Sequence, residues 1–109
     1  MDQRIQFVAS VVQADLRTPL QLRGLAESVN LSTSRLRHLF KVERGFTVLQ
    51  YQRALRLEKS RALLATTFLS VKEIITLVGI NSDSHFASDF KRTFGLTPTE
   101  YRGAANGKQ

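Results

Sequence analysis

The chain of 109 residues has no cysteine and no long apolar run. Without cysteine, disulfide bonds and thiolate metal sites are excluded. No apolar segment approaches the roughly 20 residues that a membrane-spanning helix needs, and the N-terminal residues lack the uninterrupted apolar segment of a signal peptide. We therefore expect a cytoplasmic protein that does not contact a membrane.

Acidic residues are scarce as well: nine Asp and Glu stand against sixteen Lys and Arg, which gives a net charge of +7. The positive charge is concentrated in one quarter of the chain, where only Glu43 and Glu58 are acidic. The basic residues of that stretch are Arg35, Arg37, Lys41, Arg44, Arg53, Arg56, Lys59 and Arg61. A negatively charged partner is the natural inference from this distribution.

The most informative pattern is an internal repeat of about fifty residues. Leu25, Ala26, Val29 and Leu31 recur 49 positions later as Ile74, Ile75, Val78 and Ile80. From Ser32 the shift becomes 50: Ser32, Leu36, Phe40, Lys41, Gly45, Thr47 and Tyr51 correspond to Ser82, Phe86, Phe90, Lys91, Gly95, Thr97 and Tyr101. Each copy has the outline of a helix-turn-helix, and the second has one extra residue in its turn. Two such units on a basic chain point to DNA.

Apolar spacing predicts an all-α fold, with helices at residues 3–16, 22–28, 33–44, 47–65, 71–78, 83–94 and 98–102. Start signals are Ser32, Thr47, Ser70 with Glu73, Ser82, and Thr97 with Pro98 and Glu100; stop signals are Asn30, Gly45, Gly79 and Gly95. In the fourth helix Leu49, Ala54, Leu57 and Leu64 supply the apolar positions.

We expect these helices to form one DNA-binding domain over residues 1–109. It would contain a first helix-turn-helix unit at 3–45, a long linker helix at 47–65 and a second unit at 70–102. The tail 103–109 lacks periodicity and is predicted to fray.

Three stretches carry a family resemblance: LAESVNLSTSRLRHLFKVERG, YQRALRLEKSRALL and VGINSDSHFASDFKRTFGLTPTEYR. They resemble the DNA-binding domain of the arabinose-regulator (AraC/XylS) family of bacterial transcription regulators. The resemblance implies two helix-turn-helix subdomains joined by a long helix, with two recognition helices in successive major-groove segments of double-stranded DNA. Ile75, Ile80 and Gln21 depart from the usual family pattern, and Gln21 stands where Ser or Thr commonly caps the second helix.

Two stripes of the third helix should differ in role. Burial of Leu36, Leu39 and Phe40 leaves Ser34, Arg37, His38 and Lys41 on the outer face. The resemblance implies that the base-reading positions are Ser34, Arg37 and His38. Arg37 is the strongest candidate, because a guanidinium can donate two hydrogen bonds to guanine O6 and N7.

The sixth helix buries Phe86, Phe90 and Phe94 and leaves Asp83, Ser84, His85 and Ser88 outward as further base-reading candidates. Asp83 could accept a hydrogen bond from cytosine N4, or its negative charge could simply stabilise the N-terminus of the helix through the helix dipole. Because this face has little positive charge, we expect the first unit to supply most of the base specificity.

Contacts to the DNA backbone are expected from hydroxyls near the helix starts and from basic side chains. The candidates are Thr33, Arg35, Lys41, Arg53, Ser82, Lys91 and Arg92. Their number predicts an affinity that falls steeply with salt.

Two other functions, catalysis and binding to a protein or membrane surface, have less support in the sequence. Ser82, Asp83, Ser84 and His85 offer catalytic groups, but neighbours on one helix point in different directions. His38 and His85 lie in different units, so they form no i, i+4 metal pair. We expect no enzyme activity, no metal and no cofactor. The alternative is a basic protein-binding or membrane-surface module that uses Arg53, Arg56, Lys59 and Arg61.

Family resemblance also implies possible partners other than DNA. Many members carry a ligand-sensing and dimerisation domain ahead of the DNA-binding part, and contacts to RNA polymerase are inferred from the family alone. Because Asp2, Arg4 and Ile5 lead directly into the first helix, we interpret the chain as a fragment of a longer regulator.

Overall fold

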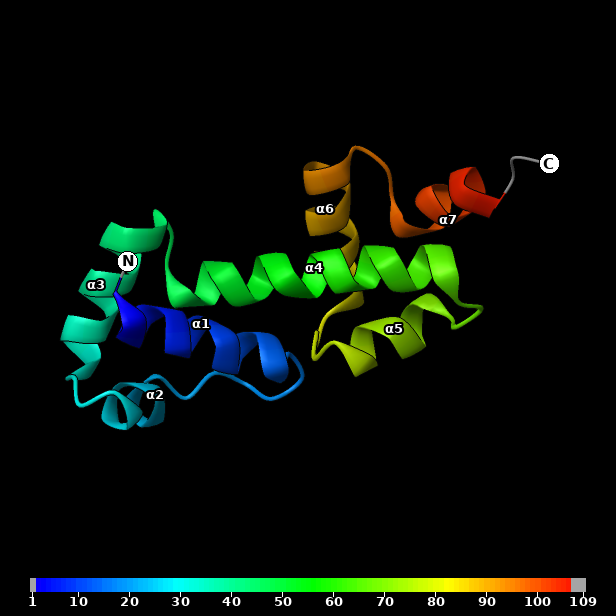
Figure 1. Cartoon of the computed structure of the whole chain (residues 1–109). Helices are drawn as coiled ribbons and strands as arrows, with labels where there is room; N and C mark the ends of the chain where they lie inside the picture. The colour runs from blue at the N-terminus through cyan, green and yellow to red at the C-terminus, as the bar shows by residue number, and fades with distance from the viewer. Residues whose placement is uncertain (1, 107–109) are drawn as a thin grey trace. The chain divides into compact units, whose positions relative to one another are not determined.

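The computed structural model describes residues 2–106. Their secondary structure is entirely helical, which confirms the predicted all-α class (Figure 1). The helices are α1 Gln3–Ala14, α2 Leu22–Ser28, α3 Thr33–Arg44, α4 Val48–Thr66, α5 Val71–Leu77, α6 Asp83–Phe94 and α7 Pro98–Asn106. Within the described residues no helix is long and apolar enough to cross a membrane.

The chain divides into two compact units, and the division lies inside α4. Unit 1 comprises Met1–Leu55 and unit 2 comprises Arg56–Gln109. In unit 1, α3 contacts both α1 and α2; in unit 2, α6 contacts both α5 and α7. Each unit therefore packs one helix, α3 or α6, against two supporting helices.

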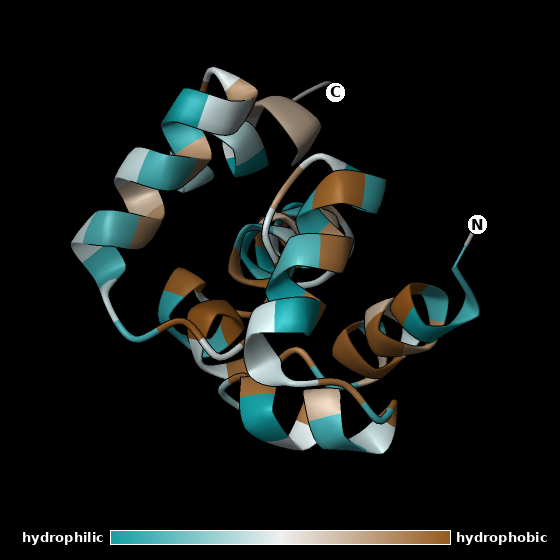
Figure 2. Cartoon of the chain, turned by 90° about the vertical axis from the view of Figure 1, so that its left-hand side faces the viewer, coloured by the Kyte–Doolittle hydropathy of each residue, from teal (hydrophilic) through white to brown (hydrophobic). Residues whose placement is uncertain are grey.

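The core of unit 1 is built from one stripe of each helix. Its buried residues are Ile5, Val8, Ala9, Val12, Ala26, Leu36, Phe40 and Val48. Apolar and polar residues alternate around the helices of this unit, as Figure 2 shows, so each helix has one face suited to the core and one suited to water. Burial of a large aliphatic or aromatic side chain contributes about 1.5–3 kcal/mol, so Leu36 and Phe40 fix how α3 is rotated about its axis.

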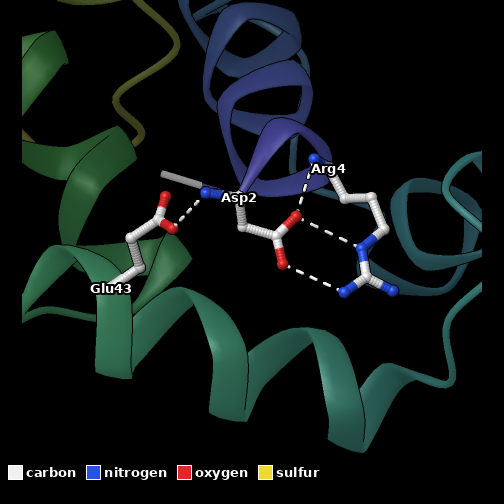
Figure 3. Close-up of polar contacts among 3 residues, drawn as sticks. All are labelled: Asp2, Arg4 and Glu43. Carbon is white, nitrogen blue, oxygen red and sulfur yellow. Dashed lines mark hydrogen bonds and ion pairs between the residues drawn. The ribbon is translucent and has the colours of Figure 1, made fainter.

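The start of α1 is capped by the Asp2 carboxylate and tied to α3 by the Glu43 carboxylate (Figure 3). Asp2 caps α1 by accepting the Arg4 N–H at 2.8 Å, and its own N–H donates to Glu43 Oε1 at 2.6 Å. Hydrogen bonds from the Arg4 side chain and backbone lower the pKa of Asp2 to about 2. The carboxylate therefore stays charged at neutral pH, and its negative charge stabilises α1 by interacting with the positive N-terminal end of the helix dipole.

The core of unit 2 is more aromatic. Its buried residues are Leu57, Leu64, Ile74, Ile75, Phe86 and Phe90. The Phe90 ring centroid lies 4.7 Å from that of Phe94 and 5.8 Å from that of Tyr101, both edge-on, which is a favourable aromatic geometry. The guanidinium of Arg61 covers the Phe94 ring at 4.9 Å from its centroid.

The two turns repeat as the sequence predicts. Asn30 and Gly79 both adopt left-handed backbone conformations, with φ of 60° and 84°. The Leu31 N–H then donates to the Ala26 carbonyl at 2.9 Å, and the Ile80 N–H donates to the Ile75 carbonyl at the same distance. Helix α3 begins five residues after the end of α2, and α6 begins six residues after the end of α5, so the second turn is one residue longer.

Three predictions about helix ends and faces were wrong. Helix α1 ends at Ala14 rather than at residue 16, because the Asp15 carboxylate accepts the backbone N–H groups of Arg17 and Thr18, each at 3.1 Å. Helix α7 continues past Arg102 to Asn106, since Ala104 and Ala105 favour helix; the rest of the tail predicted to fray lies outside the described residues.

The third error is partial and concerns the apolar positions of α4. Leu57 and Leu64 are buried as expected, but Leu49 is 57% exposed and Ala54 is also exposed, whereas Gln52 and Ser60 are buried. The polar groups of those two side chains are paired: Gln52 donates to the Thr18 carbonyl at 3.2 Å, and Ser60 donates to the Arg56 carbonyl at 2.7 Å. A hydrogen-bonded polar side chain is tolerated in a core, so a search for apolar residues alone misses this stripe.

Candidate nucleic-acid interface

Helix α3 presents one exposed polar row. The Ser32 hydroxyl caps its start by accepting the Arg35 N–H at 3.1 Å, and Gly45 ends it with φ of 83°. With Leu36 and Phe40 fully buried on one side, Ser34, Arg37, His38 and Lys41 are all exposed, and the i, i+3, i+4, i+7 spacing places them on one face. The structure therefore brings together the four side chains that the sequence predicts for the outer face.

The basic side chains of this row are available to a partner. Arg35 and Arg37 are exposed, and their guanidinium groups make no hydrogen bond or ion pair within the described part of the chain. Lys41 Nζ donates only a long bond of 3.4 Å to the Gly45 carbonyl at the end of the helix. Binding an anion here would therefore break little existing structure.

Helix α6 has the same construction with different chemistry. The Ser82 hydroxyl caps it by accepting the His85 N–H at 3.3 Å, and Phe86 and Phe90 are buried on its inner side. Asp83, Ser84, His85 and Ser88 are all exposed. Ser84 and Ser88 share a face with Lys91 by the i, i+4, i+7 spacing, whereas Asp83 and His85 lie away from that row.

Hydroxyls near the two helix starts differ in their local role. Ser82 is the N-cap of α6 and is half-buried, so its oxygen is already used by the helix. Thr33 is the first residue of α3 and is also half-buried, while the capping hydroxyl there belongs to Ser32. Both predicted backbone contacts therefore lie at a helix N-terminus, where free N–H groups favour an anion.

Charge distinguishes the two helices clearly. Helix α3 holds four basic residues and one acidic residue, so it is strongly positive. Helix α6 holds two of each, and Arg92 forms an ion pair with Asp89 one turn earlier. This pairing was missed at the sequence level, although an acidic residue three positions before an arginine is a recognisable signal on a helix.

The basic residues of α4 do not form one exposed patch. Arg53 and Lys59 are exposed, but Arg56 and Arg61 are half-buried. Arg61 donates to Glu58 at 2.5 Å while covering Phe94. Arg53, which is the residue of α4 predicted to contact the DNA backbone, is exposed and can reach a phosphate.

The described residues offer little to other kinds of site. No three His, Asp or Glu side chains there lie close enough to hold a metal ion. A groove of about 360 Å³ in unit 1 lies between α1 and α2, and none of the predicted DNA-contacting residues lines it. The two helix faces therefore remain the candidate site.

Comparison with known proteins agrees with this geometry. A protein-family model described as "Helix-turn-helix domain" matches residues 25–104. The crystal structure of a transcriptional regulator from Chromobacterium violaceum, described as AraC-type DNA-binding domain-containing, matches with a TM-score of 0.87 at 30% identity, over 98% of this chain and 96% of that one. The chain belongs to this AraC-type helix-turn-helix family. It is thus a DNA-binding domain of the kind found in bacterial transcription regulators.

Longer AraC-type relatives are also similar. The arabinose operon regulatory protein of Escherichia coli K12 is 29% identical over 109 residues, covering 99% of this chain and 37% of the relative. The xylose operon regulatory protein of the same strain is 42% identical over 83 residues, covering 76% of this chain and 21% of the relative. The chain therefore spans well under half the length of these two curated relatives.

Proposed function

We propose that this AraC-type domain binds double-stranded DNA sequence-specifically, with α3 and α6 in successive segments of the major groove. The observation that carries the proposal is the exposed row of Ser34, Arg37, His38 and Lys41 opposite the buried Leu36 and Phe40. A helix anchored by one stripe can offer the opposite stripe to base edges without losing its core contacts.

Arg37 is the principal base reader in this proposal. Its guanidinium is exposed and makes no ion pair within the described residues, so both N–H edges are free to meet guanine O6 and N7. Ser34 and His38 flank it on the same face and can each make one further contact to a base edge.

The second unit makes fewer base contacts. Ser84 and Ser88 are short and uncharged, and a serine hydroxyl can pair with several bases, so it discriminates weakly. Asp83 and His85 are assigned here as secondary contacts, with Asp83 able to accept from cytosine N4. The result is an asymmetric reader in which unit 1 sets most of the preference.

Phosphate contacts hold the helices in place. Basic side chains and helix N-termini supply them: Thr33, Arg35, Lys41, Arg53, Ser82 and Lys91. Arg92 is the weakest of the predicted contacts, because its guanidinium is paired with Asp89. We assign residues 3–45 and 70–102 as the two reading units within one DNA-binding domain. Catalysis and cofactors have no part in this function, which would be carried out in the cytoplasm.

A salt series tests the proposal directly. Fluorescence anisotropy with a random-sequence duplex should give a plot of log K against log salt with a slope of about −4, because Arg35, Lys41, Arg53 and Lys91 each neutralise one phosphate and each neutralised phosphate contributes about 0.9. No binding at low salt, or a slope near zero, would contradict the DNA-binding function.

A membrane-surface role is the alternative. Half-burial of Arg56 and Arg61 argues against it, since a lipid-binding helix needs its basic residues on one exposed face. Sedimentation with anionic liposomes at physiological salt should leave the protein in the supernatant. Co-sedimentation together with weak duplex binding would favour the membrane role instead.

In a complete regulator, we propose that this domain works beside a ligand-sensing and dimerisation domain and contacts RNA polymerase. The similarity to the arabinose and xylose operon regulatory proteins supports this context.

A further inference from the structure

We propose that Asp89 limits the non-specific DNA affinity of unit 2 by holding Arg92 away from phosphate. This inference rests on the proposed function, because it concerns how strongly α6 engages the DNA backbone. Asp89 would oppose DNA binding, whereas each DNA-contacting residue predicted from the sequence would promote it.

The geometry places the two charges one helical turn apart. Asp89 Oδ1 accepts a hydrogen bond from Arg92 Nη2 in an i, i+3 ion pair. The Asp89 side chain is only 26% exposed, whereas that of Arg92 is 73% exposed. The carboxylate is thus fixed near the helix surface, and the guanidinium, although open to solvent, is bound to it from one side.

The corresponding helix of unit 1 contains no such pair. The 50-residue register places Leu39 at the position of Asp89 and Val42 at that of Arg92. Leu39 is half-buried and packs against the core of unit 1, while Val42 is 68% exposed. Because α3 and α6 have the same length and the same kinds of cap without sharing the pair, this helix–turn–helix construction does not require it.

The ion pair should weaken phosphate binding in two ways. A phosphate must compete with the Asp89 carboxylate for the Arg92 guanidinium, and the carboxylate also repels the phosphate through its own charge. Phosphate contacts are independent of sequence, so this loss falls on non-specific binding. The base contacts of Arg37, which lies in the other unit, should be unaffected.

Asp89→Asn is the direct test, because it removes the charge and keeps the size of the side chain. On a random-sequence duplex at about 0.1 M salt we expect affinity to rise about threefold. The slope of log K against log salt should become more negative by about 0.9, as one further phosphate is neutralised.

A matched control separates this effect from a general change in net charge. Glu27 pairs with Arg23 at 3.5 Å on α2, outside both recognition helices. Glu27→Gln changes the net charge of the protein by the same amount as Asp89→Asn, and it should alter affinity and slope by less than half as much.

A double variant tests whether Arg92 mediates the effect. Arg92→Gln placed in the Asp89→Asn protein should return the slope to about its original value, because the released guanidinium is then gone. If Asp89→Asn matches Glu27→Gln, or if the double variant keeps the steeper slope, the role of Asp89 is wrong. If the unaltered protein shows no salt-dependent binding at all, the proposed function itself fails.

Folding is checked by circular dichroism at each step. If Asp89→Asn lowers the helix content, the slope of log K against log salt is instead compared for Arg92→Gln and Lys91→Gln, each made in the original protein. Arg92→Gln should then reduce the slope by much less than Lys91→Gln, and equal reductions would overturn the inference.

Discussion

Arg102 Nη2 donates a hydrogen bond to the carbonyl oxygen of Thr67 at 3.2 Å, across 35 positions of sequence. Its Nε donates to the Leu64 carbonyl at 3.1 Å, so one guanidinium satisfies two carbonyls near the end of α4. In unit 1 the Gln52 amide makes the corresponding bond to the Thr18 carbonyl, also at 3.2 Å. In unit 1 a side chain of α4 therefore bonds to the loop that follows α1, and in unit 2 a side chain of α7 bonds to the loop that follows α4.

Arg102→Ala should lower the free energy of unfolding by about 1.5–3 kcal/mol, because charged hydrogen bonds are lost and half-buried carbonyls are left without a partner. Arg102→Gln introduces the residue type that unit 1 uses and should recover part of the loss. Urea unfolding measures both variants. Equal destabilisation by the two substitutions would contradict a hydrogen-bonding role.

Stability of unit 2 should fall with acid through its capping boxes. The Thr97 N–H donates to Glu100 Oε1 at 2.9 Å, and the Ser70 N–H donates to Glu73 Oε1 at 2.8 Å. These backbone bonds, followed by those of the capping hydroxyls, lower the pKa of both glutamates from the ordinary 4.5. A lowered pKa means that the unfolded chain binds more protons, so this stability is present above about pH 4.5 and is lost as pH falls below it.

Unit 1 offers a neutral version of the same cap. The Thr47 N–H donates to Gln50 Oε1 at 2.9 Å, and no carboxylate is involved. Glu100→Gln should therefore keep the cap at neutral pH and make the unfolding free energy less dependent on pH between about 5 and 3. Urea midpoints measured across that range test this, and an unchanged pH dependence would show that Glu100 does not contribute.

Two glycines should respond to alanine in opposite directions. Gly95 has φ of 85°, which costs an L-residue about 1–2 kcal/mol, so Gly95→Ala should destabilise the protein by about that amount. Gly24 lies inside α2 with open space where a Cβ would be, so Gly24→Ala should stabilise by about 0.5–1 kcal/mol. Thermal unfolding compares the two, and a shift in the same direction for both would contradict this account.

Most helix boundaries could be predicted because their signals are local. Ser32, Ser70 and Ser82 cap the helices that follow them, as expected, and Gln21 makes no capping bond. The early end of α1 was missed because periodicity ignores the competing hydrogen bonds of Asp15.

Contacts between distant segments were beyond sequence reasoning. Neither Gln52 nor Arg102 stands out in a hydrophobic pattern, since each matters only once the loop it reaches is folded beside it. The exposed face of α3 could be predicted because the apolar stripe of Leu36 and Phe40 determines it. The Asp89–Arg92 pair was visible as a spacing, but its effect on DNA binding needs the comparison of the two folded helices.

Selection from a random duplex pool, followed by sequencing of what remains bound, tests the central claim most directly. The protein should enrich a motif in two parts about 10 base pairs apart, and Arg37→Ala should relax one part by about 1–3 kcal/mol while Ser88→Ala changes its part less. No enriched motif, or an effect of Ser88→Ala equal to or greater than that of Arg37→Ala, would contradict a two-unit reader dominated by α3.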